Sequence, residues 1–218
     1  MAKVIINDST LTAIGDAIRS KTNSTETYKP SEMPQAISSI ASNSNDLVET
    51  ISGLNYSNLS NEEVMRILNI IKEIEPLFSG IYSVGAYLFY GQEKITDIHI
   101  PEGITELDYS CFNQCNNLVN VNLSNTITHI RDNAFRGTDL TTITLPASLE
   151  HLGIYALGYC EKLNTVYFKG KPSYIHGLAF KFSENITDIY VPWSEGEVAN
   201  APWGATNATI HYNYTEEV

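Results

Sequence analysis

The chain has 218 residues, of which 43% are hydrophobic and 17% charged, so it can bury a sizeable core in one or two domains. Its 25 acidic and 13 basic residues give a formal net charge of −12. This balance argues against a nucleic-acid-binding surface and against docking on an anionic membrane, because both need clustered Lys and Arg. The sequence shows no apolar stretch long enough for a signal peptide or a membrane span, so we expect it to fold in a cytoplasm.

Residues 1–45 are expected to form a short helical hairpin followed by a linker. Two groups of apolar residues have helical spacing: Leu11, Ile14, Ala17 and Ile18, and then Met33, Ala36, Ile37 and Ile40. The stretch SSIASNSN, residues 38–45, consists mainly of Ser and Asn, which is typical of linkers.

The hairpin sequence LTAIGDAIRSKTNSTETYKPSEMPQAISSI resembles an N-terminal module of tail and fibre proteins from phages and prophages of Gram-positive bacteria. Those proteins typically show I-x-x-A-I-R-x-K-T followed by P-x-x-M-x-x-x-I. The matching residues are Ile14, Ala17, Ile18, Arg19, Lys21, Thr22, Pro30, Met33 and Ile37. The resemblance implies that this segment attaches the chain to other tail or baseplate proteins. A hairpin that serves only as a local cap is the alternative.

A helix is predicted within residues 46–79. In the stretch LSNEEVMRILNIIKEIEPLF, Ser60 and Glu63 form an S-x-x-E capping box, and Pro76 ends the helix. Apolar residues spaced alternately by three and four form a stripe along it: Val64, Ile67, Ile71, Ile74 and Phe78. Isoleucine at both kinds of core position favours three- or four-stranded coiled coils. Two interpretations stay open: the helix packs on the first repeat as a cap, or the stripe is an oligomer seam that aligns a homotrimer.

Residues 80–192 contain a repeat of 22 or 23 residues. An apolar pair separated by one residue recurs as Ile98/Ile100, Val121/Leu123, Ile143/Leu145, Val166/Phe168 and Ile189/Val191. A large apolar residue that follows a small one keeps the same interval: Phe112, Phe135, Leu157 and Phe180. Since one repeat cannot bury its own apolar side, about five repeats are expected to stack into a mainly β solenoid with one short strand each.

The units ITELDYSCFNQCNNLVNVNL and ITHIRDNAFRGTDLTTITLP resemble the bacterial BspA-type leucine-rich repeat. The resemblance covers about residues 81–192, and the first and fifth units are degenerate. It implies a leucine-rich-repeat solenoid, preceded here by a small helical region, that acts as an interaction protein such as an adhesin.

Three cysteines fall within the repeats. Cys115 and Cys160 occupy equivalent positions two repeats apart, too distant for a disulfide, and Cys111 takes the position that alanine fills elsewhere. We expect all three to fill the core as small hydrophobic residues. A metal or redox role is the alternative.

Polar side chains are expected on the outer side of the strands, in two rows along the stack. The rows are Asp97, Asn120, Thr142, Thr165 and Asp188, and His99, Asn122, Thr144, Tyr167 and Tyr190. We predict a ligand face for a bacterial surface glycan or protein at Asp97, His99, Asn120, Asn122, Tyr167, Asp188 and Tyr190. The alternative is that this side is simply solvated.

His129 and His151 occupy equivalent positions in adjacent repeats, in one column with Glu106 and Tyr174. Two imidazoles at that spacing could bind a metal or repel each other once protonated, but two ligands do not complete a zinc site. The usual catalytic and nucleotide-binding motifs are absent from the sequence. We therefore expect a protein that is not an enzyme and uses no metal or cofactor.

Residues 193–218 depart from the repeat and are predicted to cap its end. Ile210 and Tyr212 could supply a last strand, 21 residues after Ile189 and Val191. Covering residues for the open apolar end would be Pro192, Trp193, Pro202 and Trp203. The alternative is that the tryptophans form a platform on which sugars stack.

Taken together, the two resemblances imply a phage tail-fibre or baseplate-associated structural protein that contacts the host surface through its solenoid. Such a protein would be assembled in the host cytoplasm and located in the virion. The alternative is a bacterial BspA-like adhesin or protein-interaction module.

Overall fold

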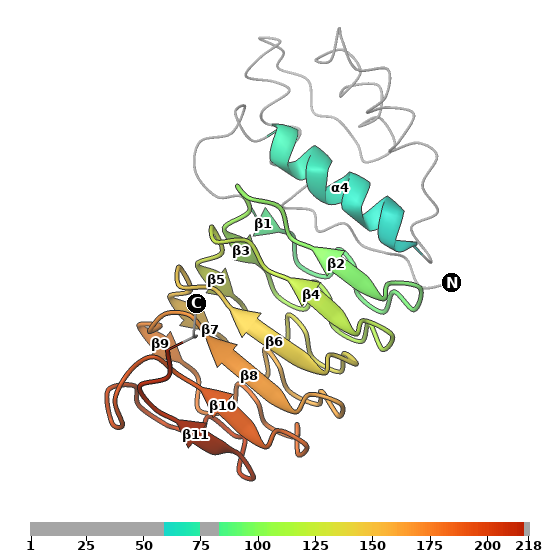
Figure 1. Cartoon of the computed structure of the whole chain (residues 1–218). Helices are drawn as coiled ribbons and strands as arrows, with labels where there is room; N and C mark the ends of the chain where they lie inside the picture. The colour runs from blue at the N-terminus through green and yellow to red at the C-terminus, as the bar shows by residue number, and fades with distance from the viewer. Residues whose placement is uncertain (1–58, 75–82, 216–218) are drawn as a thin grey trace, which may run out of the picture.

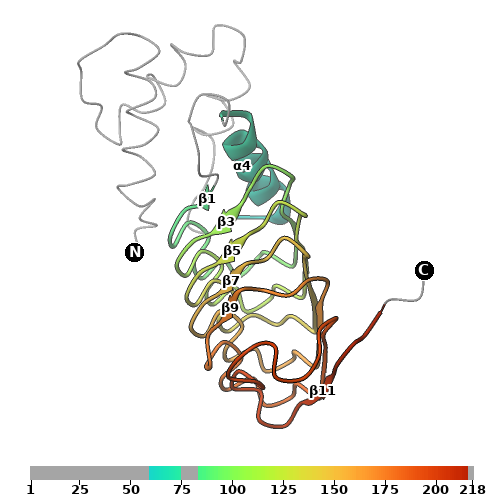
Figure 2. The same ribbon diagram turned by 90° about the vertical axis from the view of Figure 1, so that its left-hand side faces the viewer.

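The computed structural model describes residues 59–74 and 83–215, with the side chains of 70–74 left aside (Figure 1). The predicted N-terminal hairpin and linker, residues 1–45, lie outside the described residues. The described part contains one helix, α4 (Asn61–Ile74), and a coil of short parallel strands stacked one above another (Figures 1 and 2). No helix in this part of the chain is long and apolar enough to cross a bilayer.

Six of the strands lie side by side on one side of the coil and carry the apolar pairs of the repeat. Their bounds are β2 (Asp97–His99), β4 (Asn120–Asn122), β6 (Thr142–Leu145), β8 (Thr165–Phe168), β10 (Asp188–Tyr190) and β11 (Thr209–His211). The predicted mainly β, leucine-rich-repeat-like solenoid is thus confirmed. The last strand adds a rung, meaning one turn of the coil, to the five repeats expected, and Ile210 pairs with Ile189.

Each of the first five rungs also contains a second strand, which contradicts the prediction of one strand per repeat. These two-residue strands are β1 (Ser83–Val84), β3 (Glu106–Leu107), β5 (His129–Ile130), β7 (His151–Leu152) and β9 (Tyr174–Ile175). They form a parallel sheet of their own, in the order β1-β3-β5-β7-β9. The backbone of each of these strands pairs in register with the next one. The second residue of each strand is buried, so its side chain fills the core.

The sheet of longer strands is interrupted once. β2 pairs only with β4, whereas β6, β8, β10 and β11 form a separate sheet. The interruption falls at the repeat FRGTDL, which is one residue shorter than FNQCNNL and LGYCEKL at the same place.

The predicted column of large apolar residues is confirmed. Phe112, Phe135, Leu157 and Phe180 are all fully buried, and the rings of Phe112 and Phe135 stack with centroids 5.5 Å apart. Phe89 extends the column into the first repeat, 5.1 Å from Phe112, so that repeat is more regular than its sequence suggested.

Helix α4 begins with the predicted capping box. Glu63 Oε2 accepts hydrogen bonds from the Ser60 backbone N–H (2.7 Å) and hydroxyl (2.7 Å), and Ser60 Oγ accepts one from the Glu63 N–H (3.3 Å). These bonds satisfy backbone donors that the first helical turn leaves without partners.

The helix covers the open N-terminal end of the solenoid. Asn61 Oδ1 accepts from the backbone N–H of Thr96 (2.7 Å), and Asn61 Nδ2 donates to Thr96 Oγ1 (2.8 Å). Gln92 Oε1 accepts from the Leu59 N–H (2.6 Å). Side chains therefore supply the partners that a preceding rung would otherwise provide.

The far end is closed by tryptophan. Trp203 is fully buried and its ring lies 5.9 Å from Phe168 and 6.4 Å from Phe180, while Trp193 is 4% exposed. The Trp203 indole N–H donates to the Ala199 carbonyl (2.7 Å). Rings this deeply buried cannot serve as the exposed sugar platform that was considered as an alternative.

Candidate ligand-binding face

The outward side chains of the six longer strands lie on one side of the coil, here called the strand face. Register pairs join Asp97 to Asn120 and Tyr167 to Tyr190 across neighbouring strands, as the repeat predicts. β11 extends both rows, because Thr209 pairs with Asp188 and its neighbour His211 pairs with Tyr190. Every residue predicted for the ligand face lies on this surface, at Asp97, His99, Asn120, Asn122, Tyr167, Asp188 and Tyr190.

The structure divides these residues into two groups. Asp97, His99, Asn120 and Asn122 are exposed on the β2–β4 sheet. Tyr167, Asp188 and Tyr190 belong to the sheet of β6, β8, β10 and β11, and β6 lies between the two groups.

The N-terminal group is centred on one carboxylate. Asn120 Nδ2 donates to Asp97 Oδ1 (2.6 Å), one rung away. This bond, with a second from Thr96, holds the pKa of the Asp97 carboxyl below its ordinary value. The group is an exposed polar surface with an ionised carboxylate at neutral pH.

The C-terminal group contains four aromatic side chains, Tyr167, Tyr190, His211 and Tyr214, here called the tyrosine cluster. The Tyr190 ring stacks on Tyr167 (centroids 4.9 Å apart, 10° between planes) and on His211 (4.3 Å, 11°). Tyr214 lies tilted beside them, 4.8 Å from Tyr190 and 6.0 Å from Tyr167. All four side chains are half-buried, so the cluster is ordered by its own contacts and still reaches the surface.

A carboxylate anchors this cluster. His211 Nε2 lies 2.7 Å from Asp188 Oδ1, and the Thr187 hydroxyl donates to Asp188 Oδ2 (2.7 Å). The hydrogen bond to His211 is the main reason that the pKa of Asp188 lies below its ordinary value. Partial desolvation, followed by the negative charge of Asp188, raises the pKa of the Tyr190 phenol.

The stacking determines what the cluster can offer a ligand. Because β10 lies between β8 and β11, Tyr167 and His211 cover opposite faces of Tyr190. The faces are therefore occupied within the protein, and the exposed parts are ring edges and phenol hydroxyl groups. This geometry leaves Tyr190 able to make hydrogen bonds and edge contacts with a ligand, but gives it no open ring face on which a ligand could stack.

Sequence reasoning did not select two members of the cluster. His211 follows Tyr190 by 21 residues rather than 22 or 23, and only the proposed last strand at Ile210 pointed to it. Tyr214 lies beyond the last strand, where the repeat gives no information about spatial neighbours.

The predicted histidine column forms on the other sheet. The ring of His151 stacks on His129 (5.7 Å) and on Tyr174 (4.7 Å). The nearby carboxylate of Glu106 is paired with Arg131 (Nε to Oε1, 2.6 Å). The described residues contain no group of three or more His, Cys, Asp or Glu side chains that could hold a metal ion.

The three cysteines are fully buried and free. Burial raises the pKa of each thiol, to about 12 for Cys115. Cys115 Sγ donates to the Phe89 carbonyl (3.0 Å) and Cys160 Sγ to the Phe135 carbonyl (3.2 Å), so equivalent cysteines make equivalent bonds two rungs apart. These contacts are those of core residues.

The helical stripe is described only in part. Val64 and Ile67 are buried in the same core as the first repeats, within one chain. The side chains of Ile71 and Ile74, and Phe78, lie outside the described residues. The oligomer seam remains a prediction.

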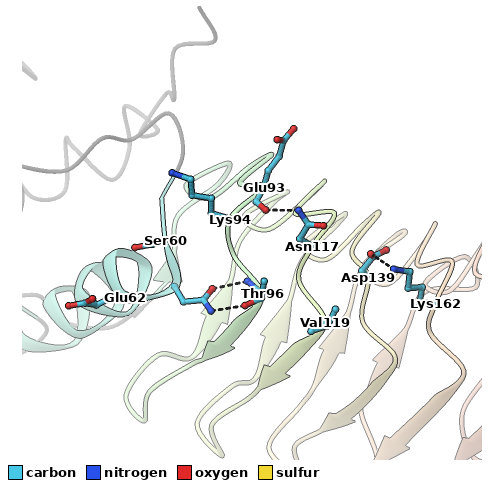
Figure 3. A pocket seen from close by; sticks show the side chains of 10 residues that line it. Ser60, Glu62, Glu93, Lys94, Thr96, Asn117, Val119, Asp139 and Lys162 are labelled. Carbon is cyan, nitrogen blue, oxygen red and sulfur yellow. Dashed lines mark hydrogen bonds and ion pairs between the residues drawn. The ribbon is translucent and has the colours of Figure 1, made fainter.

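An open pocket of about 710 Å³ lies where α4 meets the turns before the strands (Figure 3). Several of its polar groups are already paired within the chain: Asn61 binds Thr96, and Lys162 Nζ lies 2.6 Å from Asp139 Oδ2. The rim mixes cations with carboxylates, including Lys94 and Glu62. Because these side chains are engaged with one another and the rim carries both signs of charge, this pocket is a weaker candidate than the strand face.

Comparison with known proteins identifies the repeat. The sequence profile described as BspA type leucine rich repeat region matches residues 82–201 in six copies, which is 120 of the 218 residues. No curated protein matches the chain.

Three solved leucine-rich-repeat structures are similar in part. A leucine rich cell surface protein from Faecalibacterium prausnitzii shares 23% identity over 45% of this chain and 36% of its own, with a TM-score of 0.39. The T. pallidum leucine rich repeat protein shares 19% sequence identity over 62% of this chain and 64% of its own, with a TM-score of 0.47. The pneumococcal vaccine antigen PcpA shares 16% sequence identity over 61% of this chain and 39% of its own, with a TM-score of 0.46. The matched region spans less than two thirds of each of these structures.

Proposed function

The chain belongs to the BspA-type leucine-rich-repeat family, and on this basis we propose that it is a non-enzymatic binding module whose strand face recognises a protein on a bacterial surface. A solenoid of this kind presents an extended surface of repeated side chains. The strand face is the part of that surface where carboxylate, amide, hydroxyl and phenol groups are brought into regular rows.

The observation that carries the proposal is the tyrosine cluster. Tyr190 is held between Tyr167 and His211, and His211 is bonded to Asp188. Side chains fixed in this way lose little further conformational freedom when a partner binds, which is how tyrosines act as anchors in recognition surfaces.

The partner class follows from the exposed atoms. A glycan is commonly held by stacking on an open aromatic face, and both faces of Tyr190 are occupied. Phenol hydroxyl groups and ring edges, beside the exposed Thr142 and Thr144, suit the mixed polar and apolar surface of a protein. We therefore favour a protein partner over a surface glycan.

The test is binding of the full chain to whole Gram-positive cells, which are either untreated, protease-treated or periodate-treated. Protease should remove binding and periodate should not. The double variant Tyr167→Ala/Tyr190→Ala should bind at least about tenfold more weakly, because central aromatic residues carry most of the energy of such interfaces. Tyr109→Ala, an exposed tyrosine outside the strand face, is the matched control and should bind normally.

Two results would contradict the proposal. Unchanged binding by the double variant would remove the strand face as the binding surface. Loss of binding after periodate alone would identify a glycan instead.

A phage tail-fibre or baseplate role is the second candidate. It is supported by the sequence of residues 14–37, which matches the tail-protein motif at positions such as Arg19, Lys21 and Pro30. Under this proposal the protein would be located in the virion, with residues 1–45 bound to other tail proteins. Tail, baseplate and lysis genes beside its own gene would support this role, and wall-anchoring or secretion genes in their place would count against it.

A further inference from the structure

A second surface lies away from the strand face, on the turns that connect β7 to β8 and β9 to β10. Three aromatic side chains gather there: Tyr155, Tyr159 and Phe182, here called the turn cluster. Tyr159 is 38% exposed and Phe182 is 42% exposed, and Leu178 beside them is 38% exposed. The rings contact one another, with centroids 4.6 Å apart for Tyr159 and Phe182 and 6.1 Å for Tyr155 and Tyr159. Exposed apolar side chains are common singly, but a contiguous group indicates an interaction site.

The backbone of the turn cluster is unfavourable for these residues. Tyr155, Tyr159 and Phe182 have φ values of 50°, 58° and 67°, in the left-handed region that bulky side chains rarely adopt. The position of Tyr159 and Phe182 holds Gly91 (φ 67°), Gln114 (φ 60°) and Gly137 (φ 70°) in the other rungs, and glycine carries no steric cost in this conformation. At Tyr159 and Phe182 the chain thus places exposed aromatic residues where glycine would relieve strain. Strain kept at a surface is a reason to look for a function there.

Two cations accompany the rings. The Arg136 guanidinium lies 4.1 Å from the centre of the Tyr159 ring, and Lys181 Nζ lies 5.3 Å from the centre of Phe182. Within residues 59–69 and 83–215, neither cation forms an ion pair with a carboxylate. On a chain with a net charge of −12, this combines apolar area with unpaired positive charge in one place.

We propose that the turn cluster binds an acidic peptide segment of a partner protein, with an apolar or aromatic side chain seated against Tyr159 and Phe182. The carboxylates of the segment would face Arg136 and Lys181, which lie over the rings. Binding would not have to break an ion pair of either cation with another carboxylate of the described residues. This surface is separate from the strand face, because its residues belong to turns and not to the strands that carry the tyrosine cluster. The chain therefore has two independent recognition surfaces.

The test is selection of a random twelve-residue peptide library on the immobilised full chain. The expected result is enrichment of peptides that combine Asp or Glu with an aromatic or large aliphatic residue. The double variant Tyr159→Gly/Phe182→Gly should lose at least about tenfold in affinity for these peptides. Its melting temperature should be unchanged or higher, because glycine relieves the left-handed strain at both positions.

Tyr87→Asn is the matched control. Tyr87 is 44% exposed and has φ 60°, but it lies on the first rung, away from Arg136 and Lys181. This variant should bind the selected peptides normally, and so should Tyr167→Ala/Tyr190→Ala, which separates this inference from the strand-face proposal.

Three results would overturn the inference. One is the absence of any enriched peptide, or enrichment of basic peptides. Another is peptide binding that survives the glycine double variant. The third is a lower melting temperature of that variant, since it would show that the aromatic side chains are there to stabilise the fold.

Discussion

The imidazole of His151 lies parallel to that of His129 on the next rung, with ring centroids 5.7 Å apart and 12° between planes. Nδ1 of His151 is buried without a hydrogen-bond partner. Burial is the main reason that the pKa of His151 lies below its ordinary value, and the positive charges of Arg131 and His129 lower it further, against smaller opposing effects of Asp132 and Glu106. The stack therefore favours a neutral His151.

Acid should destabilise the solenoid through this residue. Because the folded-state pKa of His151 is lowered, the unfolded chain takes up its proton at a higher pH than the folded chain does. The free energy of unfolding should keep its full value above about pH 6.5, the pKa of an unperturbed histidine. It should then decrease as the pH falls from there through the lower pKa of His151 in the folded chain. His151→Tyr, which keeps a ring in the stack, should show a smaller drop in melting temperature between pH 7.5 and 5. His99→Gln, an exposed histidine, is the control. A pH dependence identical to wild type in His151→Tyr would contradict the assignment.

Removing one ring from the core column should be costly. Phe135 is fully buried and stacks on Phe112, so Phe135→Ala should lower the free energy of unfolding by about 3–5 kcal/mol. Urea unfolding followed by circular dichroism measures the change. Tyr109→Ala, at a 39% exposed position, should change it by less than about 0.5 kcal/mol. Equal effects of the two variants would mean that the column does not hold the rungs together.

The thiols should be unreactive in the folded protein. With a pKa of about 12, Cys115 is ionised in about one molecule in ten thousand at pH 8, and all three thiols are buried. Titration with a thiol-specific reagent should detect none of Cys111, Cys115 and Cys160 before denaturation and all three after it. A thiol that reacts rapidly under native conditions would support the redox alternative.

The helix cap should depend on Asn61. Asn61→Ala removes the hydrogen bonds that its side chain makes to the backbone N–H and hydroxyl of Thr96. It should lower the free energy of opening the first rung by about 1–2 kcal/mol. Amide hydrogen exchange of Thr96 and its neighbours should rise, while that of β8 and β10 should not. Glu62→Gln, which breaks only the exposed Glu62–Arg66 pair, is the control and should leave exchange unchanged. Unaltered exchange at Thr96 in Asn61→Ala would show that the helix does not protect this edge.

The repeat in the sequence was sufficient to predict the solenoid and its internal neighbours. Phe112 and Phe135 stack, and Asp97 pairs with Asn120, because residues one repeat apart along the chain become neighbours across parallel strands. The capping box at Ser60 and Glu63 was equally predictable, since it depends only on residues within one helical turn.

Other features were decided only by the tertiary structure. The second strand of the first five rungs arises because the return path of the coil also runs in register with its neighbour. The sequence placed Glu106, His129, His151 and Tyr174 in one column, but two residues are too few to show the alternation that predicts a strand. His211 joins the tyrosine cluster through an irregular 21-residue step, and Tyr214 through a chain segment outside the repeat.

The spacing of the repeat thus determined which residues meet, because a coil of constant period places equivalent positions one above another. It did not determine how their side chains are oriented on meeting. The stacking of Tyr190 between Tyr167 and His211 depends on side-chain torsion angles that are set by contacts between rungs. The same is true of the left-handed backbone of Tyr159 and Phe182 beside Arg136. Those contacts exist only once the chain has coiled.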